Sequence, residues 1–168
     1  MAVATIGLGA NLGDREEAID AALSALDALP VVHVVRVSSL RETDPVGYTD
    51  QPRFLNGAAQ LETDMPPAAL LAALLAVEAG LGRVRTGPRN GPRSIDLDLL
   101  LYGDLVVDEP GLQVPHPRAQ ERCFVLEPLV DLDPGLVIPG SGRAADLLAA
   151  LSCTPGLVVR PQAPSVPR

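Results

Sequence analysis

The spacing of apolar residues along this chain alternates between the period of strands and the period of helices. Short apolar or β-branched runs predict strands at residues 2–9, 31–40, 54–61, 93–102 and 105–107. Apolar residues three and four apart predict helices at residues 14–29, 66–81, 123–132 and 143–151. Strands that alternate with two long helices predict an α/β sandwich with βαβ units.

The strand predicted at residues 93–102 carries two carboxylates on one face. Side chains on a strand point alternately to opposite faces, so Asp96 and Asp98 share one side. The apolar residues that share the other side are Ile95, Leu97, Leu99 and Leu101. Neighbouring carboxylates repel each other, and a hard divalent metal held together with substrate phosphates would neutralise both. A strand with one solvated face is the alternative interpretation.

Four arginines precede this strand. Residues 82–93 contain Arg83, Arg85, Arg89 and Arg93 together with three glycines and two prolines, which predicts a loop. Guanidinium groups beside a carboxylate pair are what a polyphosphate site requires, because metal and arginine together must offset the charge of a nucleotide triphosphate. A solvated charged loop is the alternative.

Length, composition and charge narrow the classes of function. A chain of 168 residues that is 47% hydrophobic can form one compact domain, which we expect at residues 1–154. The net charge of −8 argues against general affinity for nucleic acid or anionic membranes. Residues 155–168 are rich in proline, so we expect a poorly ordered tail.

The expected location is a reducing cytoplasm. The sequence has no charged and then apolar leader and no apolar run near twenty residues, so we expect neither secretion nor membrane insertion. Its two cysteines, Cys123 and Cys153, are too few and too isolated to predict a metal cluster or a disulfide framework.

Phe54 and Asn56 share one face of the strand at residues 54–61. The chain has only two Phe, two Tyr and no Trp, so an aromatic ring beside an amide is notable. The ring could stack on a flat heterocycle, and the amide could both donate and accept hydrogen bonds at its edge. Taken alone, Phe54 is more typical of a core residue.

Several motifs, in order from about residue 6 to residue 139, resemble the 6-hydroxymethyl-7,8-dihydropterin pyrophosphokinases of the folate pathway. The motifs are GLGANLGD at residues 7–14, QPRFLN at 51–56, GRVR at 82–85, GPRSIDLDLLLYG at 91–103, VPHPR at 114–118 and RCFVLEPL at 122–129. The resemblance implies an α+β fold, a ferredoxin-like α/β sandwich with a mixed, largely antiparallel sheet flanked by helices. It also implies transfer of pyrophosphate from ATP to the hydroxymethyl group of the dihydropterin, which yields AMP and the pterin diphosphate.

The resemblance also implies roles for particular residues. The residues implied in catalysis are Arg83, Arg93, Asp96 and Asp98, with Asp96 and Asp98 holding two Mg²⁺ ions. The residues implied in ATP binding are Glu78, Arg85, Arg93, Leu99, His116 and Arg122. The residues implied in pterin binding are Thr43, Val46, Phe54, Asn56 and Phe124, with backbone groups near the first two completing the pocket. We expect a monomer whose partners are ATP and the pterin.

Other interpretations stay open at this stage. Glu78 lies near the end of its predicted helix and could be solvated, and a single histidine such as His116 is more often structural than catalytic. Asn90 and Pro117 stand where some family members have aromatic residues. A regulatory nucleotide-binding module without turnover would keep the aspartates and arginines but release no AMP. A structural oligomerisation domain would leave the paired aspartates unexplained.

Overall fold

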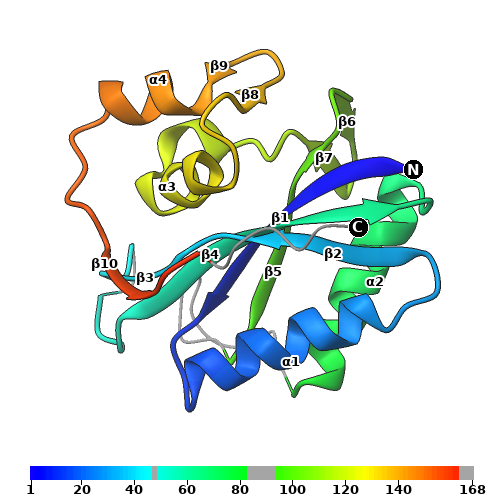
Figure 1. Ribbon diagram of the computed structural model, residues 1–168, viewed down its shortest axis with the longest axis horizontal. Helices are drawn as coiled ribbons and strands as arrows, with labels where there is room; N and C mark the ends of the chain where they lie inside the picture. The colour runs from blue at the N-terminus through cyan, green and yellow to red at the C-terminus, as the bar shows by residue number, and fades with distance from the viewer. Residues whose placement is uncertain (47–48, 83–93, 163–168) are drawn as a thin grey trace.

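A six-stranded sheet with helices on both faces forms the body of the molecule (Figure 1). The computed structural model describes residues 1–46, 49–82 and 94–162. The elements in chain order are β1 (Ala2–Ala10), α1 (Arg15–Asp27), β2 (Val32–Val37), β3 (Leu40–Thr43), β4 (Phe54–Thr63), α2 (Pro67–Gly80), β5 (Asp96–Tyr102), β6 (Val107–Glu109), β7 (Leu112–Val114), a 3₁₀ turn (Ala119–Glu121), α3 (Cys123–Leu132), β8 (Val137–Ile138), β9 (Gly142–Arg143), α4 (Ala144–Ala150) and β10 (Leu157–Arg160).

The strand order confirms the predicted ferredoxin-like α+β sandwich. The main path of the sheet is β10-β3-β4-β1-β5, and β2 also pairs with β4. The two βαβ units are β1-α1-β2 and β4-α2-β5, and each is split by a strand of the other. β4 lies between β1 and β2, and β1 lies between β4 and β5. All pairings that the structure describes in this sheet are antiparallel. The helices α1 and α2 cover one face, and α3 and α4 cover the other (Figure 1).

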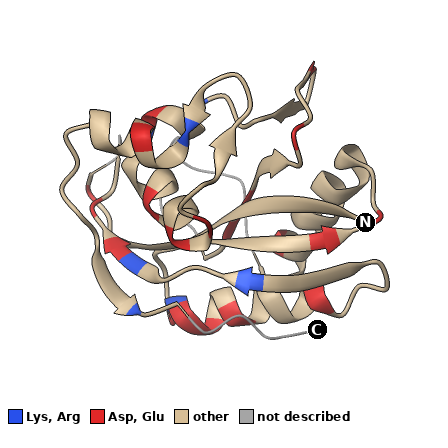
Figure 2. Cartoon of the chain, turned by 45° about the horizontal axis from the view of Figure 1, so that its top comes forward, with Lys and Arg blue, Asp and Glu red and all other residues tan. Residues whose placement is uncertain are grey.

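Each face of the sheet buries its own apolar cluster. Ile6, Leu97 and Leu99 pack with residues of α1 and α2 in the first cluster. Leu100 and Leu101 pack with residues of α3 and α4 in the second. Charge does not distinguish the two layers, since Figure 2 shows acidic residues on helices at both faces. Within the described ranges, no helix is both long and apolar enough to cross a membrane.

A β-bulge in β5 corrects the predicted alternation. Thr5 pairs with Leu101 and Ile6 pairs with Leu99, so Leu100 is one extra residue on β5. An extra residue reverses the faces beyond it. Leu101 therefore joins Leu100 in the second cluster, instead of sharing the face of Leu97 and Leu99 as predicted.

The strand predicted at residues 31–40 is divided into β2 and β3. Both halves pair with β4, but Val37 faces Ala59 while Arg41 faces Asn56, which leaves one extra residue between them. Ser38 fills this irregularity: its backbone N–H donates to the Ala58 carbonyl, and its hydroxyl accepts from the Ala58 N–H, both at 2.8 Å. The side-chain hydroxyl thus replaces a ladder bond where the strand bends.

Two segments are more ordered than the sequence predicts. Residues 157–160 were expected in a poorly ordered tail, but they form β10, which pairs with β3. The short strand expected at 105–107 and the loop after it form instead a hairpin of β6 and β7, which turns at Gly111 with a φ of 80°. Glycine tolerates this left-handed conformation, which the turn requires.

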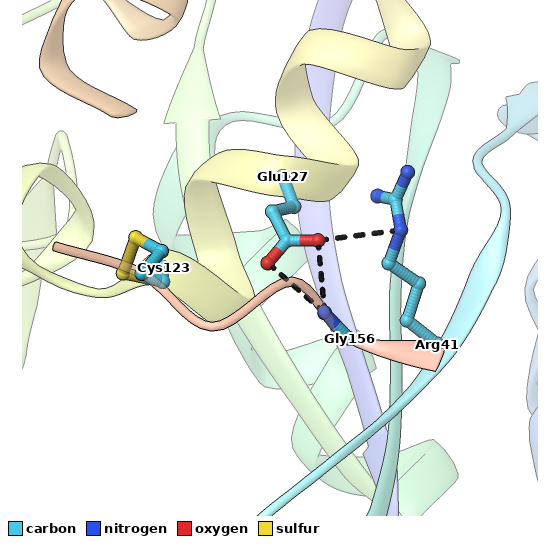
Figure 3. The surroundings of a disulfide bond; sticks show 5 residues. Arg41, Cys123, Glu127 and Gly156 are labelled. Carbon is cyan, nitrogen blue, oxygen red and sulfur yellow. Dashed lines mark hydrogen bonds and ion pairs between the residues drawn. A yellow bond between two sulfur atoms is a disulfide. The ribbon is translucent and has the colours of Figure 1, made fainter. Parts of the chain in front are cut away.

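The two cysteines are paired, contrary to expectation. Cys123 at the start of α3 and Cys153 after α4 form a disulfide across a separation of 30 residues, with Cα atoms 6.0 Å apart. Figure 3 shows the chain beyond Cys153 continuing past α3, where the Gly156 N–H donates to Glu127 at 3.4 Å. Glu127 also forms an ion pair of 3.3 Å with Arg41 of β3. The disulfide and the Gly156 hydrogen bond attach the segment after α4 to α3, and the ion pair attaches α3 to β3.

Candidate active site

Two cavities meet at Asp98. The larger, of about 670 Å³, is lined by α2, β5, the hairpin of β6 and β7, and residues 116–117. The smaller, of about 60 Å³, is lined by side chains from β3, β4, β5 and α3 and from the segments beside them. Asp98 lines both cavities, and Asp96 lines the smaller one. The predicted shared face of the two aspartates is therefore confirmed.

The smaller cavity brings together all five residues implied in pterin binding. Phe54 at the start of β4 and Phe124 in the first turn of α3 both line it. Asn56 of β4 is 9% exposed, and its amide Nδ2 donates to the hydroxyl of Thr43. Val46 also lines the cavity and is itself exposed. Two rings and an edge amide thus surround a narrow space of the kind that a flat heterocycle needs.

Gly9 was missed by the sequence reasoning. It pairs with Asn56 on one side and with Asp96 on the other, in the middle of the sheet. A Cβ at this position would lie 3.1 Å from Oδ1 of Asn56 and 3.8 Å from Cβ of Asp96. Its neighbour Gly7 pairs with Asp98 but would place a Cβ 3.5 Å from Leu100, an ordinary contact. Glycine on the cavity face of a strand was the signal that could have identified this position.

The larger cavity is acidic in the part that the structure describes. Its lining includes the carboxylates of Asp98, Asp108 and Glu109. None of the described residues around it is Lys or Arg, and His116 is its one potentially basic side chain there. An anionic ligand in this cavity therefore requires cations from elsewhere.

His116 lies at the side of the larger cavity, where its surroundings disfavour the protonated imidazole. Burial, followed by the charge of Arg122, lowers the pKa of His116 below its ordinary value of 6.5, while Asp96 acts in the opposite direction. Its Nδ1 accepts a hydrogen bond of 3.2 Å from the backbone N–H of Arg118. When the ring is neutral, this hydrogen bond leaves its proton on Nε2, which can donate to a ligand oxygen.

Arg122 links the two cavities electrostatically. It lines the smaller cavity, and its guanidinium carbon lies 5.5 Å from the centre of the Phe124 ring. This is the geometry of a cation–π contact. The same charge affects His116 beside the larger cavity.

Comparison with known proteins identifies the family. A sequence model of 7,8-dihydro-6-hydroxymethylpterin-pyrophosphokinase matches residues 5–134. The chain belongs to this pyrophosphokinase family. The 2-amino-4-hydroxy-6-hydroxymethyldihydropteridine pyrophosphokinase of Pseudomonas aeruginosa is 50% identical over 145 residues, which cover 86% of this chain and 89% of that protein. The Bacillus subtilis enzyme of the same name is 46% identical over 130 residues, 77% of each chain.

A solved structure supports the pyrophosphokinase fold. The crystal structure of Plasmodium falciparum HPPK-DHPS with pterin and p-hydroxybenzoate matches 88% of this chain with a TM-score of 0.67. The present chain spans 41% of the length of that protein, and the sequences are 15% identical, so this likeness concerns the fold alone.

The remaining residues implied by the pyrophosphokinase resemblance have different outcomes. Leu99 and Pro117 line the larger cavity. Glu78 is neither solvated nor among the described lining residues of either cavity, because it is 1% exposed inside the core. The residues that lie outside the described part of the chain are Arg83, Arg85, Asn90 and Arg93.

The two aspartates suit a magnesium ion. Asp96 and Asp98 are half-buried and face the junction of the cavities. No group of three or more His, Cys, Asp or Glu that could hold a metal occurs in the described residues. Mg²⁺ is typically bound by one or two carboxylates together with substrate phosphates, so this pair fits a metal that arrives with a nucleotide.

Proposed function

We propose that this chain transfers the pyrophosphoryl group of ATP to the hydroxymethyl group of 6-hydroxymethyl-7,8-dihydropterin, with ATP in the larger cavity and the pterin in the smaller one. The observation that carries the proposal is the position of Asp98, which lines both cavities. A group can pass between two substrates only where they meet. This family activity belongs to folate biosynthesis.

The smaller cavity is the proposed binding site of the pterin. Phe54 and Phe124 would stack on the two faces of the ring, and Asn56 would read its edge. The hydrogen bond from Asn56 to Thr43 fixes the orientation of that amide before the ligand arrives. Backbone groups near Thr43 and Val46 complete the proposed pocket.

Asp96 and Asp98 are the proposed ligands of two Mg²⁺ ions. Bound Mg²⁺ supplies positive charge that offsets and orients the triphosphate. Both carboxylates project from one strand whose other face is packed in the core, so their spacing is fixed by the backbone of β5. Asp98 is also the proposed acceptor of the hydroxyl proton, since it borders both substrates.

The phosphates are the proposed ligands of the basic residues. His116 would donate through Nε2, and Arg122 would contribute charge from the pterin side. We include Arg85 and Arg93 in nucleotide binding, and Arg83 and Arg93 in stabilising the charge that develops during transfer. In this reaction the hydroxymethyl oxygen attacks the β-phosphorus, the bond from that phosphorus to the oxygen of the α-phosphate breaks, and AMP leaves.

An assay for AMP tests this function. AMP release should require ATP, the hydroxymethyl dihydropterin and Mg²⁺ together. Asp96→Ala and Asp98→Ala should each lower kcat by roughly 10³-fold, because both positioning and charge stabilisation are lost. Pterin affinity without nucleotide should change little. A protein that binds both ligands but releases no AMP would be a regulatory module instead.

Both cavities are lined by one chain, so we propose that a monomer is the active unit. Light scattering during size-exclusion chromatography should give the mass of one chain. A dimer that loses activity on dilution would contradict this proposal.

We also propose a cytoplasmic location, where ATP is available. The disulfide between Cys123 and Cys153 is the opposing observation, since such bonds persist mainly in oxidising compartments. Mass spectrometry after rapid alkylation of intact cells distinguishes a reducing cytoplasm from an oxidising compartment. Two free thiols support the cytoplasm, and a complete disulfide contradicts it.

A further inference from the structure

Glu78 is a carboxylate buried behind the strand that carries Asp96 and Asp98. It is 1% exposed and lies on α2, two helical turns after Leu70 and one after Leu74. Residues four apart on a helix share one face. Both leucines belong to the cluster that packs against β5. Glu78 therefore occupies the position where the same pattern would place a third apolar residue.

The carboxylate bonds to the backbone between the two aspartates. Oε2 of Glu78 accepts a hydrogen bond of 2.7 Å from the N–H of Leu97. β5 is the last strand of the sheet beside β1, and an edge strand directs every second N–H away from its neighbour. Glu78 satisfies that donor inside the core, where an unpaired N–H would be costly.

Packing alone does not account for a carboxylate at this position. Transfer of a charged group from water into a protein interior is unfavourable, and a leucine or methionine would fill the same space without that cost. One contact that a leucine or methionine could not make is the hydrogen bond with the backbone at Leu97. The Leu97 N–H belongs to the peptide unit that joins Asp96 to Leu97, and the next unit joins Leu97 to Asp98. A shift of this amide therefore changes the orientation of both aspartates.

We propose that Glu78 is a positioning residue for the metal-binding pair: through the N–H of Leu97 it fixes the backbone that aims Asp96 and Asp98 at the junction of the cavities. This rests on the proposed function, in which those aspartates hold Mg²⁺. In this proposal Glu78 orients the aspartates, instead of contacting ATP directly as the family resemblance implies.

Two substitutions separate the hydrogen bond from the charge. Glu78→Asp keeps the charge but withdraws the carboxylate by one methylene, so it cannot reach Leu97 without a shift of the backbone. Glu78→Gln keeps the length and an acceptor oxygen but removes the charge. Leu74→Val is the matched control, because it loosens the same helix face one turn away from the hydrogen bond.

The first measurement needs no metal. Amide hydrogen exchange, followed by NMR in Mg²⁺-free protein, should be at least about tenfold faster at Leu97 in Glu78→Asp than in the wild type. The second measurement follows Mn²⁺ binding by electron paramagnetic resonance, with a non-hydrolysable ATP analogue present. Glu78→Asp should bind Mn²⁺ about 10- to 100-fold more weakly, as expected when a group that orients metal ligands is lost. Glu78→Gln should stay closer to the wild type in both measurements.

The proposal is overturned if Leu74→Val weakens Mn²⁺ binding as much as Glu78→Asp does, since Glu78 would then act only through stability. It is also overturned if both Glu78 variants lose affinity for AMP measured without metal, because Glu78 would then contact the nucleotide. Asp98→Ala separates this failure from failure of the proposed function. If that variant binds Mn²⁺ as the wild type does, the metal site and the role of Glu78 are both wrong.

Discussion

The two cavities differ in how completely the folded chain prepares them for a ligand. In the smaller cavity, the side chains that would contact the pterin are already held by contacts with one another. Asn56 donates to Thr43, and the guanidinium of Arg122 lies over the ring of Phe124. In the larger cavity, the described lining carries three carboxylates and no Lys or Arg, so its charge opposes the binding of an anion. The proposed pterin site is thus formed by described side chains that already contact one another, whereas the described part of the proposed nucleotide site needs cations from outside it.

Because of this difference, we expect substitutions to affect pterin affinity and nucleotide affinity in different ways. Changes to the proposed pterin contacts Phe54, Asn56 and Phe124 should alter pterin affinity with or without Mg²⁺. Changes around the larger cavity should alter nucleotide affinity in a way that depends on Mg²⁺ and on salt, because charge dominates there. The first three predictions below test this distinction, and the fourth follows the titration of His116 beside the larger cavity.

Loss of the disulfide should produce the largest change. A closed loop of about 30 residues predicts that Cys123→Ser/Cys153→Ser lowers the free energy of unfolding by about 3–4 kcal/mol. Cys123 lies between Arg122 and Phe124, so pterin affinity should fall more than ATP affinity. Urea unfolding and calorimetry measure the two effects. Reductant should reproduce the loss in the wild type and leave the double variant unchanged; equal stabilities in all samples would mean that the bond does not form.

Replacement of Asn56 should weaken pterin binding alone. Asn56→Leu leaves the edge of the heterocycle unpaired in a largely buried site, at a cost of about 1–3 kcal/mol. Affinity for ATP with Mg²⁺ should stay nearly constant, since Asn56 does not line the larger cavity. Calorimetric titrations that show equal losses for both ligands would indicate general unfolding instead of a specific contact.

A methyl group at Gly9 should have a smaller effect of the same kind. Gly9→Ala places Cβ 3.1 Å from Oδ1 of Asn56, so the amide must shift, and pterin affinity should fall by about 1 kcal/mol. Gly7→Ala is the matched control on the same face of β1, because its Cβ meets Leu100 at an ordinary 3.5 Å. If both variants bind the pterin equally well, Gly9 does not shape the cavity.

The pH dependence of stability should show the smallest effect. Because burial lowers the pKa of His116, the unfolded chain takes up a proton near pH 6.5 before the folded chain does. The free energy of unfolding should therefore decrease as the pH falls through 6.5 towards the lower pKa of the folded state. His116→Gln should reduce this slope, measured by Tm between pH 7.5 and pH 5.5. An unchanged slope would show that other groups account for it.

Local patterns in the sequence predicted most of the central fold. The aspartate side chain of Asp14 caps α1 by accepting from the N–H of Glu17, as its position before the apolar repeat predicts. The alternation in β5 likewise placed Asp96 and Asp98 on one face. These features depend on neighbours within a few residues, so a single sequence contains them.

Features that depend on distant partners were missed. The bulge at Leu100 arises from the register with β1, and β10 is stabilised by pairing with β3 although Leu157 is 63% exposed. The disulfide joins the start of α3 to the segment after α4, across a separation of 30 residues. The contact of Gly9 with Asn56 and the hydrogen bond from the Leu97 N–H to Glu78 belong to the same class, because each joins two different elements. Periodicity describes the faces of an element but does not identify the partner of each face.

The central claim is that the two substrates occupy different cavities and meet at Asp98. A crystal structure with the hydroxymethyl pterin, a non-hydrolysable ATP analogue and Mg²⁺ tests this claim most directly. We expect the pterin ring between Phe54 and Phe124, the nucleotide in the cavity bordered by Leu99 and His116, and the hydroxymethyl oxygen facing the β-phosphate beside Asp98. A pterin bound away from both rings, or a β-phosphate remote from Asp98, would contradict the account.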